Sequence, residues 1–230
     1  MMIVAKSKIL LYRIRKALAE DPNQFLQQVT GVIHIGANVG QERNLYKKYD
    51  LDVIWIEPIP EVFTQLQANL SGYKEQRAFQ YLVTEVDHQK YDFFISNNNG
   101  QSSSILDLKG HKEIWPNIEF TTTLSLASIT LDSLLKKEQI DVTRYQALIM
   151  DTQGSEMLVL QGSLPVLKHF EFIKLEVPDF ESYGGCCQLS DISAFMMENG
   201  YSEYARDKFA SRAKVGSYFD IVYRNKTKSE

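Results

Sequence analysis

The sequence predicts an α/β fold in which a mainly parallel sheet is covered by helices on both faces. Short apolar stretches alternate with helical patterns along most of the chain, as they do in βαβ units. The C-terminal region departs from this alternation, because two β-rich segments follow one another there and suit an antiparallel pair. With 230 residues, 44% of them hydrophobic and 23% charged, the chain is long enough for one such domain with a sizeable core.

Five apolar stretches are expected to form the parallel part of the sheet, and several of them end at a glycine or a carboxylate. Pro60 suits the first turn of a helix in which Val62, Leu66 and Leu70 recur every four residues. A second helix is expected after Gly154. The expected parallel strands are 32–35, 53–56, 79–83, 147–150 and 170–177; a helix at 191–199 precedes the antiparallel pair, 201–206 and 218–223, and a polar gap is expected between the two strands of that pair.

The region 84–146 is the least regular part of the chain. It contains a strand pattern at 91–96, a polar loop at 97–101, a β-rich stretch at 120–129 and a short helical pattern at 131–137. No Pro-, Gly- or Ser-rich linker separates it from the rest. We therefore expect a single domain over 1–230, with an insert at 84–146 between the third and fourth main strands. A helical N-terminal extension is expected at 1–30, and residues 1–18 of it are expected to form an amphipathic helix. Residues 226–230 are expected to be a frayed tail.

Charge and cysteine content narrow the possible functions. The net charge of −4, from 25 basic and 29 acidic residues, indicates no broad nucleic-acid surface. The only cysteines, Cys186 and Cys187, are neighbours, so they predict neither a structural bridge nor a zinc site, and a reduced, cytoplasmic location is expected. Basic residues interrupt every apolar run near the N-terminus, and no run is long enough to span a bilayer. We expect no metal, no nucleic-acid partner and no transmembrane segment.

A strand, a glycine-containing turn and a later carboxylate predict an adenosine-binding site. The strand 32–35 leads into Gly36 and Gly40, and glycine permits both a tight turn and close approach of a ligand. Glu57 follows the next strand, where a carboxylate can accept hydrogen bonds from both hydroxyls of a ribose. Asn38 occupies the middle position of the turn, where a dinucleotide fingerprint has glycine, so a nicotinamide-dependent oxidoreductase is disfavoured. No triphosphate-binding loop is present, and S-adenosylmethionine is the adenosine ligand that fits best.

Several motifs, in this order, resemble the FkbM family of S-adenosylmethionine-dependent methyltransferases. They are His34-Ile35-Gly36-Ala37-Asn38-Val39-Gly40, Trp55-Ile56-Glu57-Pro58-Ile59-Pro60, Gly100-Gln101-Ser102-Ser103, Thr130-Leu131-Asp132, Asp151-Thr152-Gln153-Gly154-Ser155-Glu156 and the strand 172–176. Together they cover about two thirds of the chain. The resemblance implies a class I methyltransferase fold, which is a Rossmann-like three-layer sandwich whose seven-stranded, mostly parallel sheet has an antiparallel C-terminal strand.

The resemblance also implies an activity and a set of cofactor-binding residues. The family's usual reaction is O-methylation, here of a hydroxyl on a sugar, polyketide or other secondary-metabolite acceptor, and the partner would be a small molecule or a glycan. One departure is His34, because the family usually has an acidic residue there; a neutral histidine accepts a hydrogen bond without adding negative charge. His34 is either a direct cofactor contact or a histidine satisfied by hydrogen bonds in the core. The residues expected to bind S-adenosylmethionine are His34, Gly36, Asn38, Gly40, Glu57, Pro58, Ser102, Ser103 and Asp151.

Three residues are candidates for the catalytic step: Asp151, Glu176 and His111. Asp151 ends a main strand at the ligand-bearing edge, although an aspartate there can also cap the next helix. Glu176 and Asp179 follow the fifth strand, where either can act as a general base or belong to a solvated turn. His111 lies in the polar insert, as a lid histidine that accepts a proton or as an ordinary surface residue. Glu156 is either a cap partner or a site residue.

Two hypotheses of different classes remain. The first is an S-adenosylmethionine-dependent methyltransferase that acts on a hydroxyl. The second is a cofactor-binding or interaction module of the same fold with weakened catalysis, motivated by His34 and by the lack of a clear general base. The acceptor and the oligomeric state stay open.

Overall fold

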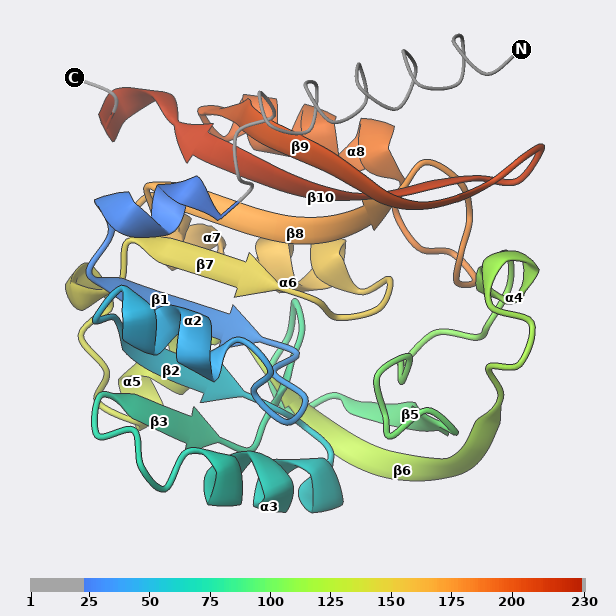
Figure 1. Ribbon diagram of the computed structural model, residues 1–230, viewed down its shortest axis with the longest axis horizontal. Coiled ribbons are helices and arrows are strands. Elements are labelled where there is room, and N and C mark those ends of the chain that lie inside the picture. Colours follow the sequence, from blue (N-terminus) through green and yellow to red (C-terminus); the bar gives the residue numbers. More distant parts are fainter. Residues whose placement is uncertain (1–22, 229–230) are drawn as a thin grey trace, which may run out of the picture.

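A seven-stranded sheet is the main element of the computed structural model, which describes residues 23–228 (Figure 1). The expected helix at 1–18 and residues 229–230 lie outside this range. Within the described residues, no helix is both long enough and apolar enough to cross a membrane. The main strands are β1 (Gly31–Ile35), β2 (Asp52–Ile56), β3 (Gln76–Phe79), β7 (Ala147–Met150), β8 (Phe172–Pro178), β9 (Tyr201–Arg212) and β10 (Gly216–Asn225).

The order of the strands is β3-β2-β1-β7-β8-β10-β9, and it confirms the predicted fold class. In this order β3, β2, β1, β7 and β8 pair in parallel, whereas β10 is antiparallel to both β8 and β9. Parallel strands joined by crossover helices end at the same edge, so the carboxyl ends of β1, β2, β7 and β8 all lie on one side of the molecule (Figure 1). That edge positions the candidate site.

Helices cover both faces of the sheet and divide the core into two layers. Along β1, Ile33 and Ile35 pack on one side with residues of α5, α6, α7 and α8, whereas Val32 packs on the other side with residues of α2 and α3. All five residues of β1 are buried for this reason. The helices are α2 (Arg43–Lys48), α3 (Pro60–Asn69), α5 (Leu131–Lys137), α6 (Glu156–Gly162), α7 (Leu164–Leu167) and α8 (Leu189–Glu198), with 3-10 turns at Gln24–Gln28, Val142–Arg144 and Lys226–Lys228.

Residues 82–129 contribute a small second sheet beside the carboxyl ends of the main strands, and most of it lies in the predicted insert at 84–146 (Figure 1). Its strands are β4 (Leu82–Val83), β5 (Lys90–Ser96) and β6 (Phe120–Ile129), in the order β4-β6-β5. A four-residue helix, α4 (His111–Ile114), lies in the connection between β5 and β6. Thr130 caps α5 by accepting a hydrogen bond from the backbone N–H of Ser133, and α5 then packs into the main core.

Three sequence-based expectations about the elements were wrong in detail. The strand expected at 79–83 divides after Phe79, because the chain leaves β2 there and Leu82 and Val83 pair with β6. The expected polar gap after 206 is mostly strand, since β9 continues to Arg212 and forms a long hairpin with β10. The start of the expected frayed tail forms a 3-10 turn in which the backbone N–H of Thr227 donates to Asn225.

The turn after β1 requires glycine at position 36. Gly36 has φ of +81°, and a Cβ built there would lie 1.9 Å from the backbone oxygen of Asp151. The backbones of the β1 turn and the β7 end therefore touch with no room for a side chain.

We expect Gly36→Ala to lower the free energy of unfolding by at least ~1–3 kcal/mol, because both the left-handed backbone and the contact with Asp151 become strained. Denaturant titration of the purified variant measures the loss. Gly72→Ala is the matched control, since a Cβ at Gly72 has no neighbour within 4 Å and the change should be nearly neutral. Equal stability of the two variants would contradict this account of the turn.

Candidate functional site

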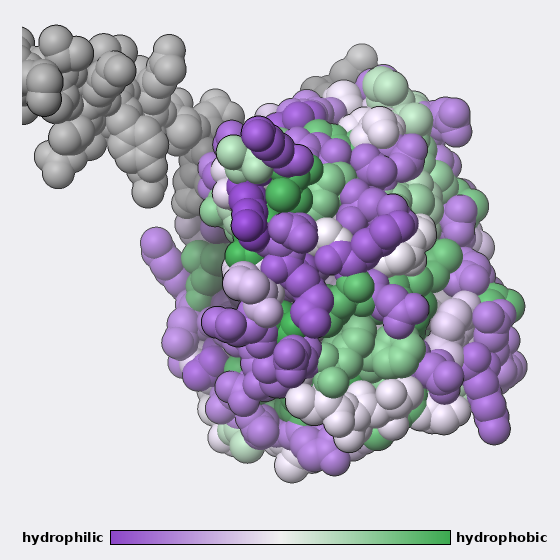
Figure 2. All heavy atoms as spheres, turned by 90° about the vertical axis from the view of Figure 1, so that its right-hand side faces the viewer, coloured by the Kyte–Doolittle hydropathy of each residue, from purple (hydrophilic) through white to green (hydrophobic). Residues whose placement is uncertain are grey.

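A cavity of about 370 Å³ opens at the carboxyl edge of the sheet. Figure 2 looks onto this edge, where hydrophilic side chains frame a more hydrophobic area. The cavity is lined by the ends of β1, β2, β7 and β8, by the region 98–118 and by the β9–β10 hairpin. Its size falls within the ~300–1,000 Å³ range of small-molecule sites.

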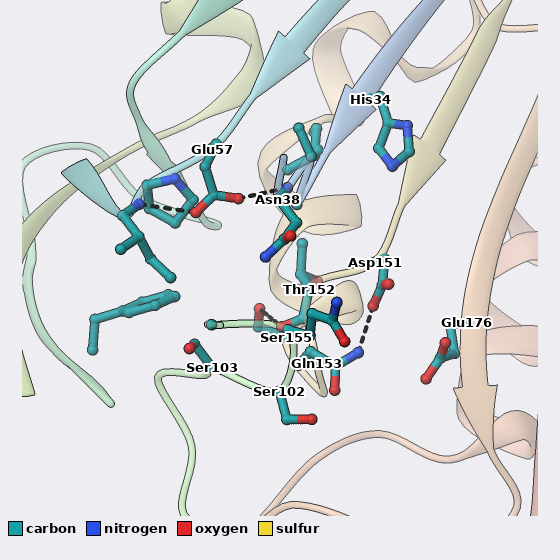
Figure 3. Close-up of a pocket in the computed structure, with 18 of the residues that line it drawn as sticks. His34, Asn38, Glu57, Ser102, Ser103, Asp151, Thr152, Gln153, Ser155 and Glu176 are labelled. Carbon is teal, nitrogen blue, oxygen red and sulfur yellow. Dashed lines mark hydrogen bonds between the residues drawn. The ribbon is translucent and has the colours of Figure 1, made fainter. Parts of the chain in front are cut away.

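The glycine turn and Glu57 form one hydrogen-bonded unit at the cavity wall. The backbone N–H groups of Gly36 and Ala37 both donate to the carbonyl of Ile56, which ties the turn to the end of β2. Asn38, with φ of +45°, donates its backbone N–H to Glu57 Oε2 at 2.8 Å. The other oxygen, Oε1, accepts the backbone N–H of Ile59 at 2.9 Å (Figure 3). The side chain of Glu57 is therefore held in one orientation.

Glu57 keeps capacity for a ligand despite these two bonds. A carboxylate offers about four lone-pair sites, and the two backbone donors use one on each oxygen. Burial raises the pKa of Glu57 to about 7, and the hydrogen bonds from Ile59 and Asn38 oppose that rise. Pro58 follows directly and, like Glu57, lines the cavity.

Asp151 and Glu176 bring two half-buried carboxyl groups into the same cavity, from the ends of β7 and β8 (Figure 3). Burial raises the pKa of Asp151 to about 7, although Asp151 Oδ1 accepts a 2.6 Å hydrogen bond from Gln153 Nε2. Burial and, next, the charge of Asp151 raise the pKa of Glu176 well above its ordinary value. The predicted site residues at these two strand ends are brought together.

Glu156 and Asp179 were each expected to be either a site residue or a structural one, and their hydrogen-bond partners decide between these alternatives. Glu156 is buried and does not line the cavity; its carboxylate accepts the backbone N–H groups of Thr152 and Gly154, so it holds the turn after β7. Asp179 is exposed and also lies away from the cavity, where it accepts the backbone N–H of Ser217 at the start of β10. Both are structural residues in this geometry.

His34 lines the cavity as a neutral, constrained side chain. Its Nδ1 is 2.9 Å from the hydroxyl of Tyr46, and its ring stacks on Trp55 with centroids 4.9 Å apart. Burial lowers the pKa of His34 to about 4, so the imidazole is uncharged at neutral pH. It adds no positive charge to a cavity in which a cationic ligand is expected.

His111 is a buried residue, so the alternative of an ordinary surface histidine was wrong. Backbone pairing with the segment after β8 draws it inward, because the N–H of His111 donates to the carbonyl of Ser182. Its Nδ1 is 2.8 Å from the hydroxyl of Tyr218, and the rings of Trp115 and Tyr183 pack against it. Its Nε2 is buried with no hydrogen-bond partner among residues 23–228. Burial lowers the pKa of His111 to about 4.

Two of the remaining predicted residues line the cavity and one does not. Ser102 and Ser103 are buried at its wall, where the hydroxyl of Ser103 accepts the backbone N–H of Ser96. Gly40 does not line the cavity, because its turn faces α3, and a Cβ there would lie 2.8 Å from Leu66. The glycine at this position serves helix packing in this structure.

Gln153 and the apolar walls of the cavity were not predicted from the sequence. Gln153 stands inside the motif from Asp151 to Glu156, so its place between two carboxylates was an available signal. Trp115 and Phe209 come from the long insert and from a region expected to be a loop, and no sequence pattern joins them to the strand ends. Other apolar lining residues are Ile59, Leu82, Val83, Phe93 and Ile118.

Comparison with models of known protein families shows which family the chain belongs to. The profile described as the Methyltransferase FkbM domain matches residues 34–203, which is more than half of the 230 residues. The chain belongs to the FkbM methyltransferase family. This confirms the resemblance found in the motifs, and with it the expected cofactor of the family, S-adenosylmethionine.

Solved structures show the same fold at very low sequence identity. TrmK from M. capricolum, in complex with S-adenosyl-homocysteine, is 8% identical with a TM-score of 0.51; the match covers 89% of this chain and 67% of that one. The METTL16 MTase domain is 11% identical with a TM-score of 0.50, over 88% of this chain and 64% of that one. No curated protein sequence matches the chain significantly.

The residues of this FkbM-family cavity fit S-adenosylmethionine chemically. Glu57 is a fixed hydrogen-bond acceptor of the kind that ribose hydroxyls need, and Ile59, Val83 and Phe93 are apolar side chains of the kind against which a base packs. Asp151 and Glu176 are carboxyl groups that carry negative charge for a cationic group when they are ionised. Among the described residues, no group of three or more His, Cys, Asp and Glu side chains is placed to hold a metal ion.

The raised carboxyl pKa values predict an unusual pH dependence of stability. Glu57 and Asp151, with folded pKa values of about 7, bind protons that the unfolded chain has already released above pH ~4–5. The free energy of unfolding should therefore fall by roughly 1–2 kcal/mol between pH 6.5 and 8. His34 and His111, whose folded pKa values are about 4, oppose this trend only below their unfolded pKa of ~6.5.

Chemical denaturation of the unliganded protein at several pH values measures this slope. Asp151→Asn should be more stable than the wild type at pH 8 and should show a smaller decline, because one buried ionisation is gone. Stability that rises between pH 6.5 and 8 in the wild type would refute the assignment.

Proposed function

We propose that this protein transfers a methyl group from S-adenosylmethionine to a hydroxyl of a small-molecule or glycan acceptor, such as a sugar, a polyketide or another secondary metabolite. The observation that carries the proposal is Glu57, whose buried carboxylate is fixed at the cavity wall by the backbone N–H groups of Asn38 and Ile59. A ribose-binding acceptor beside a glycine turn serves an adenosine ligand.

The chain's contribution to cofactor binding is divided among three strand ends. Glu57 accepts the ribose hydroxyls, and the turn from Gly36 to Asn38 lies against the nucleoside. Asp151 faces the positively charged part of the ligand, which neutral His34 does not repel. Bound S-adenosylmethionine supplies a methyl group already activated on a cationic sulfur, so positioning of the two reactants provides most of the catalysis. Ser102 and Ser103 close the cavity on the insert side.

Methylation of a hydroxyl releases a proton, and Glu176 is the residue we assign to take it up. Its carboxyl lines the cavity, and a raised pKa makes its ionised form a better proton acceptor than an ordinary glutamate. His111 is the second candidate for this role. His111 also lines the cavity, and its Nε2 is buried with no hydrogen-bond partner among the described residues.

The acceptor side of the cavity favours a ring-bearing neutral molecule. Trp115 and Phe209 line it, and aromatic side chains offer flat apolar surfaces to such rings. The net charge of −4 does not favour an RNA or DNA acceptor. The free thiols of Cys186 and Cys187 agree with a reducing compartment, so the cytoplasm stays the expected location.

Incubation of the purified protein with methyl-labelled S-adenosylmethionine and a panel of sugar, polyketide and RNA acceptors tests the proposal. Label in an ether of a small-molecule or glycan acceptor supports it. Label in RNA, or on nitrogen, contradicts the acceptor class. Tight cofactor binding without transfer to any acceptor favours the catalytically weakened module, and a folded protein that binds no cofactor refutes the function.

We expect Glu57→Gln to weaken S-adenosylmethionine binding about ten-fold to a hundred-fold, because charge-assisted hydrogen bonds contribute roughly 1.5–3 kcal/mol. The amide nitrogen would also oppose the N–H of Asn38 or Ile59. Calorimetry measures the affinity, and a melting curve checks folding. Glu198→Gln, on the exposed side of α8, is the control with unchanged affinity. Wild-type affinity in Glu57→Gln would mean that the ribose binds elsewhere.

We expect Glu176→Gln to lower kcat by roughly 10²–10⁴-fold, as the loss of a general base does, and to change cofactor affinity much less. Steady-state rates with the best acceptor from the panel measure the effect. Asp179→Asn is the control. Asp179 is only three residues away in sequence, but its side chain is exposed and lies outside the cavity, so the rate should not change. If both variants kept wild-type rates, the proton acceptor would have to be sought at His111.

A further inference from the structure

Asp151 is the end of a chain of two partly buried hydrogen bonds that begins at Tyr183. The Tyr183 hydroxyl donates to Gln153 Oε1 at 2.7 Å, and Gln153 Nε2 donates to Asp151 Oδ1 at 2.6 Å. Figure 3 shows the second of these bonds, with Gln153 lying across the cavity beside Asp151. The chain joins the loop after β8 to the end of β7.

This chain of hydrogen bonds has a definite direction, because the donor in one bond fixes which atom of the next residue is left to donate. A carboxylate cannot donate, so Gln153 must present its nitrogen to Asp151 and its oxygen to Tyr183. The backbone of Gln153 is held as well: it has φ of +51°, and its carbonyl accepts a 2.8 Å hydrogen bond from the hydroxyl of Ser104. Loss of the Tyr183 hydroxyl would leave the amide free to turn its oxygen toward Asp151.

Tyr183 is itself anchored by the region that forms the other side of the cavity. It is 1% exposed and bridges to Leu108, and its ring packs against His111 with centroids 5.0 Å apart. Gly154 passes close to the same ring, since a Cβ there would lie 3.0 Å from it. The orientation of Asp151 therefore depends on the segment that also carries His111.

Asp151 needs such support because its surroundings are acidic. Its ionised form is disfavoured first by burial and then by nearby carboxylates. The hydrogen bond from Gln153 opposes this effect. The charged groups that face Asp151 are Glu156 of α6, Asp220 of β10 and Glu42 before α2, with Glu57 of β2 and Glu176 of β8 sensing its charge in turn.

We propose that Tyr183 and Gln153 are positioning residues that hold the Asp151 carboxylate toward the cavity in the ionised form that a cationic ligand requires. The identity of that ligand as S-adenosylmethionine rests on the proposed function, but the support of Asp151 by Tyr183 and Gln153 does not. Neither Tyr183 nor Gln153 takes part in the chemical step in this scheme.

Carbon-13 NMR of the aspartate carboxyls in the unliganded protein tests the proposal directly. Asp151→Asn identifies the resonance, and the titration is compared between the wild type, Tyr183→Phe and Gln153→Met. Both variants keep the size of the side chain and remove only its polar group. We expect the pKa of Asp151 to rise in each by roughly one pH unit above its wild-type value of about 7.

Tyr223→Phe is the matched control, because its hydroxyl lies 2.9 Å from Ser193 Oγ and neither Tyr223 nor Ser193 lines the cavity. It should leave the Asp151 titration unchanged. An Asp151 pKa equal to the wild-type value in both Tyr183→Phe and Gln153→Met would overturn the proposal, and so would a shift of the same size in the control.

Calorimetry with S-adenosylmethionine provides a second measurement. Asp151 is ionised in the wild type above its pKa and in the variants only at higher pH. The affinity of the wild type should therefore exceed that of the variants by almost ten-fold at pH ~6 and by about three-fold at pH ~7.5. The difference should shrink at pH 9, where Asp151 is ionised in every form, and Tyr223→Phe should follow the wild type. Equal affinity of wild type and variants across this range would count against the proposal. If the wild type bound no cofactor, the proposed function would fail, and the NMR titration would still decide the role of Tyr183 and Gln153.

Discussion

The hydrogen bonds from Asn38 and Ile59 to Glu57 join the glycine turn after β1 to the end of β2, and the cavity depends on this junction. Without it the turn would have no partner for the Asn38 N–H, and the Glu57 carboxylate would have no defined direction. Close contact of Gly36 with Asp151 extends the same junction to β7. Three neighbouring strand ends are thus locked together by backbone contacts before any ligand binds, which preorganises the site.

The cavity concentrates acidic groups that do not favour the folded state. Glu57, Asp151 and Glu176 all lose hydration on burial, and the charge of Asp151 also disfavours the ionisation of Glu57 and Glu176. Proteins tolerate such an arrangement where a ligand of opposite charge completes it, and a sulfonium nucleoside with an ammonium group is a ligand of this kind. The features that fit the site for a cation therefore reduce the stability of the empty protein.

Long-range pairing completes the site from segments that are distant in sequence. The loop after β8 pairs with the stretch before α4, so His111 and Tyr183 come to lie side by side. The hairpin of β9 and β10 adds Phe209 and Tyr218 to the same side of the molecule. Segments that are distant in sequence consequently meet in one aromatic cluster beside the cavity.

The sequence by itself determined the strands, the glycine turn and the carboxylates at the strand ends. These are local features: apolar runs, special backbone angles and spacing from a strand end are legible in a short window, as at Gly36 and Glu57. Only the tertiary structure decided that Glu156 supports a turn, that His111 is buried and that Gln153 bridges Tyr183 to Asp151. The physical reason is that burial and hydrogen-bond direction depend on partners far away in the chain, which no local pattern encodes.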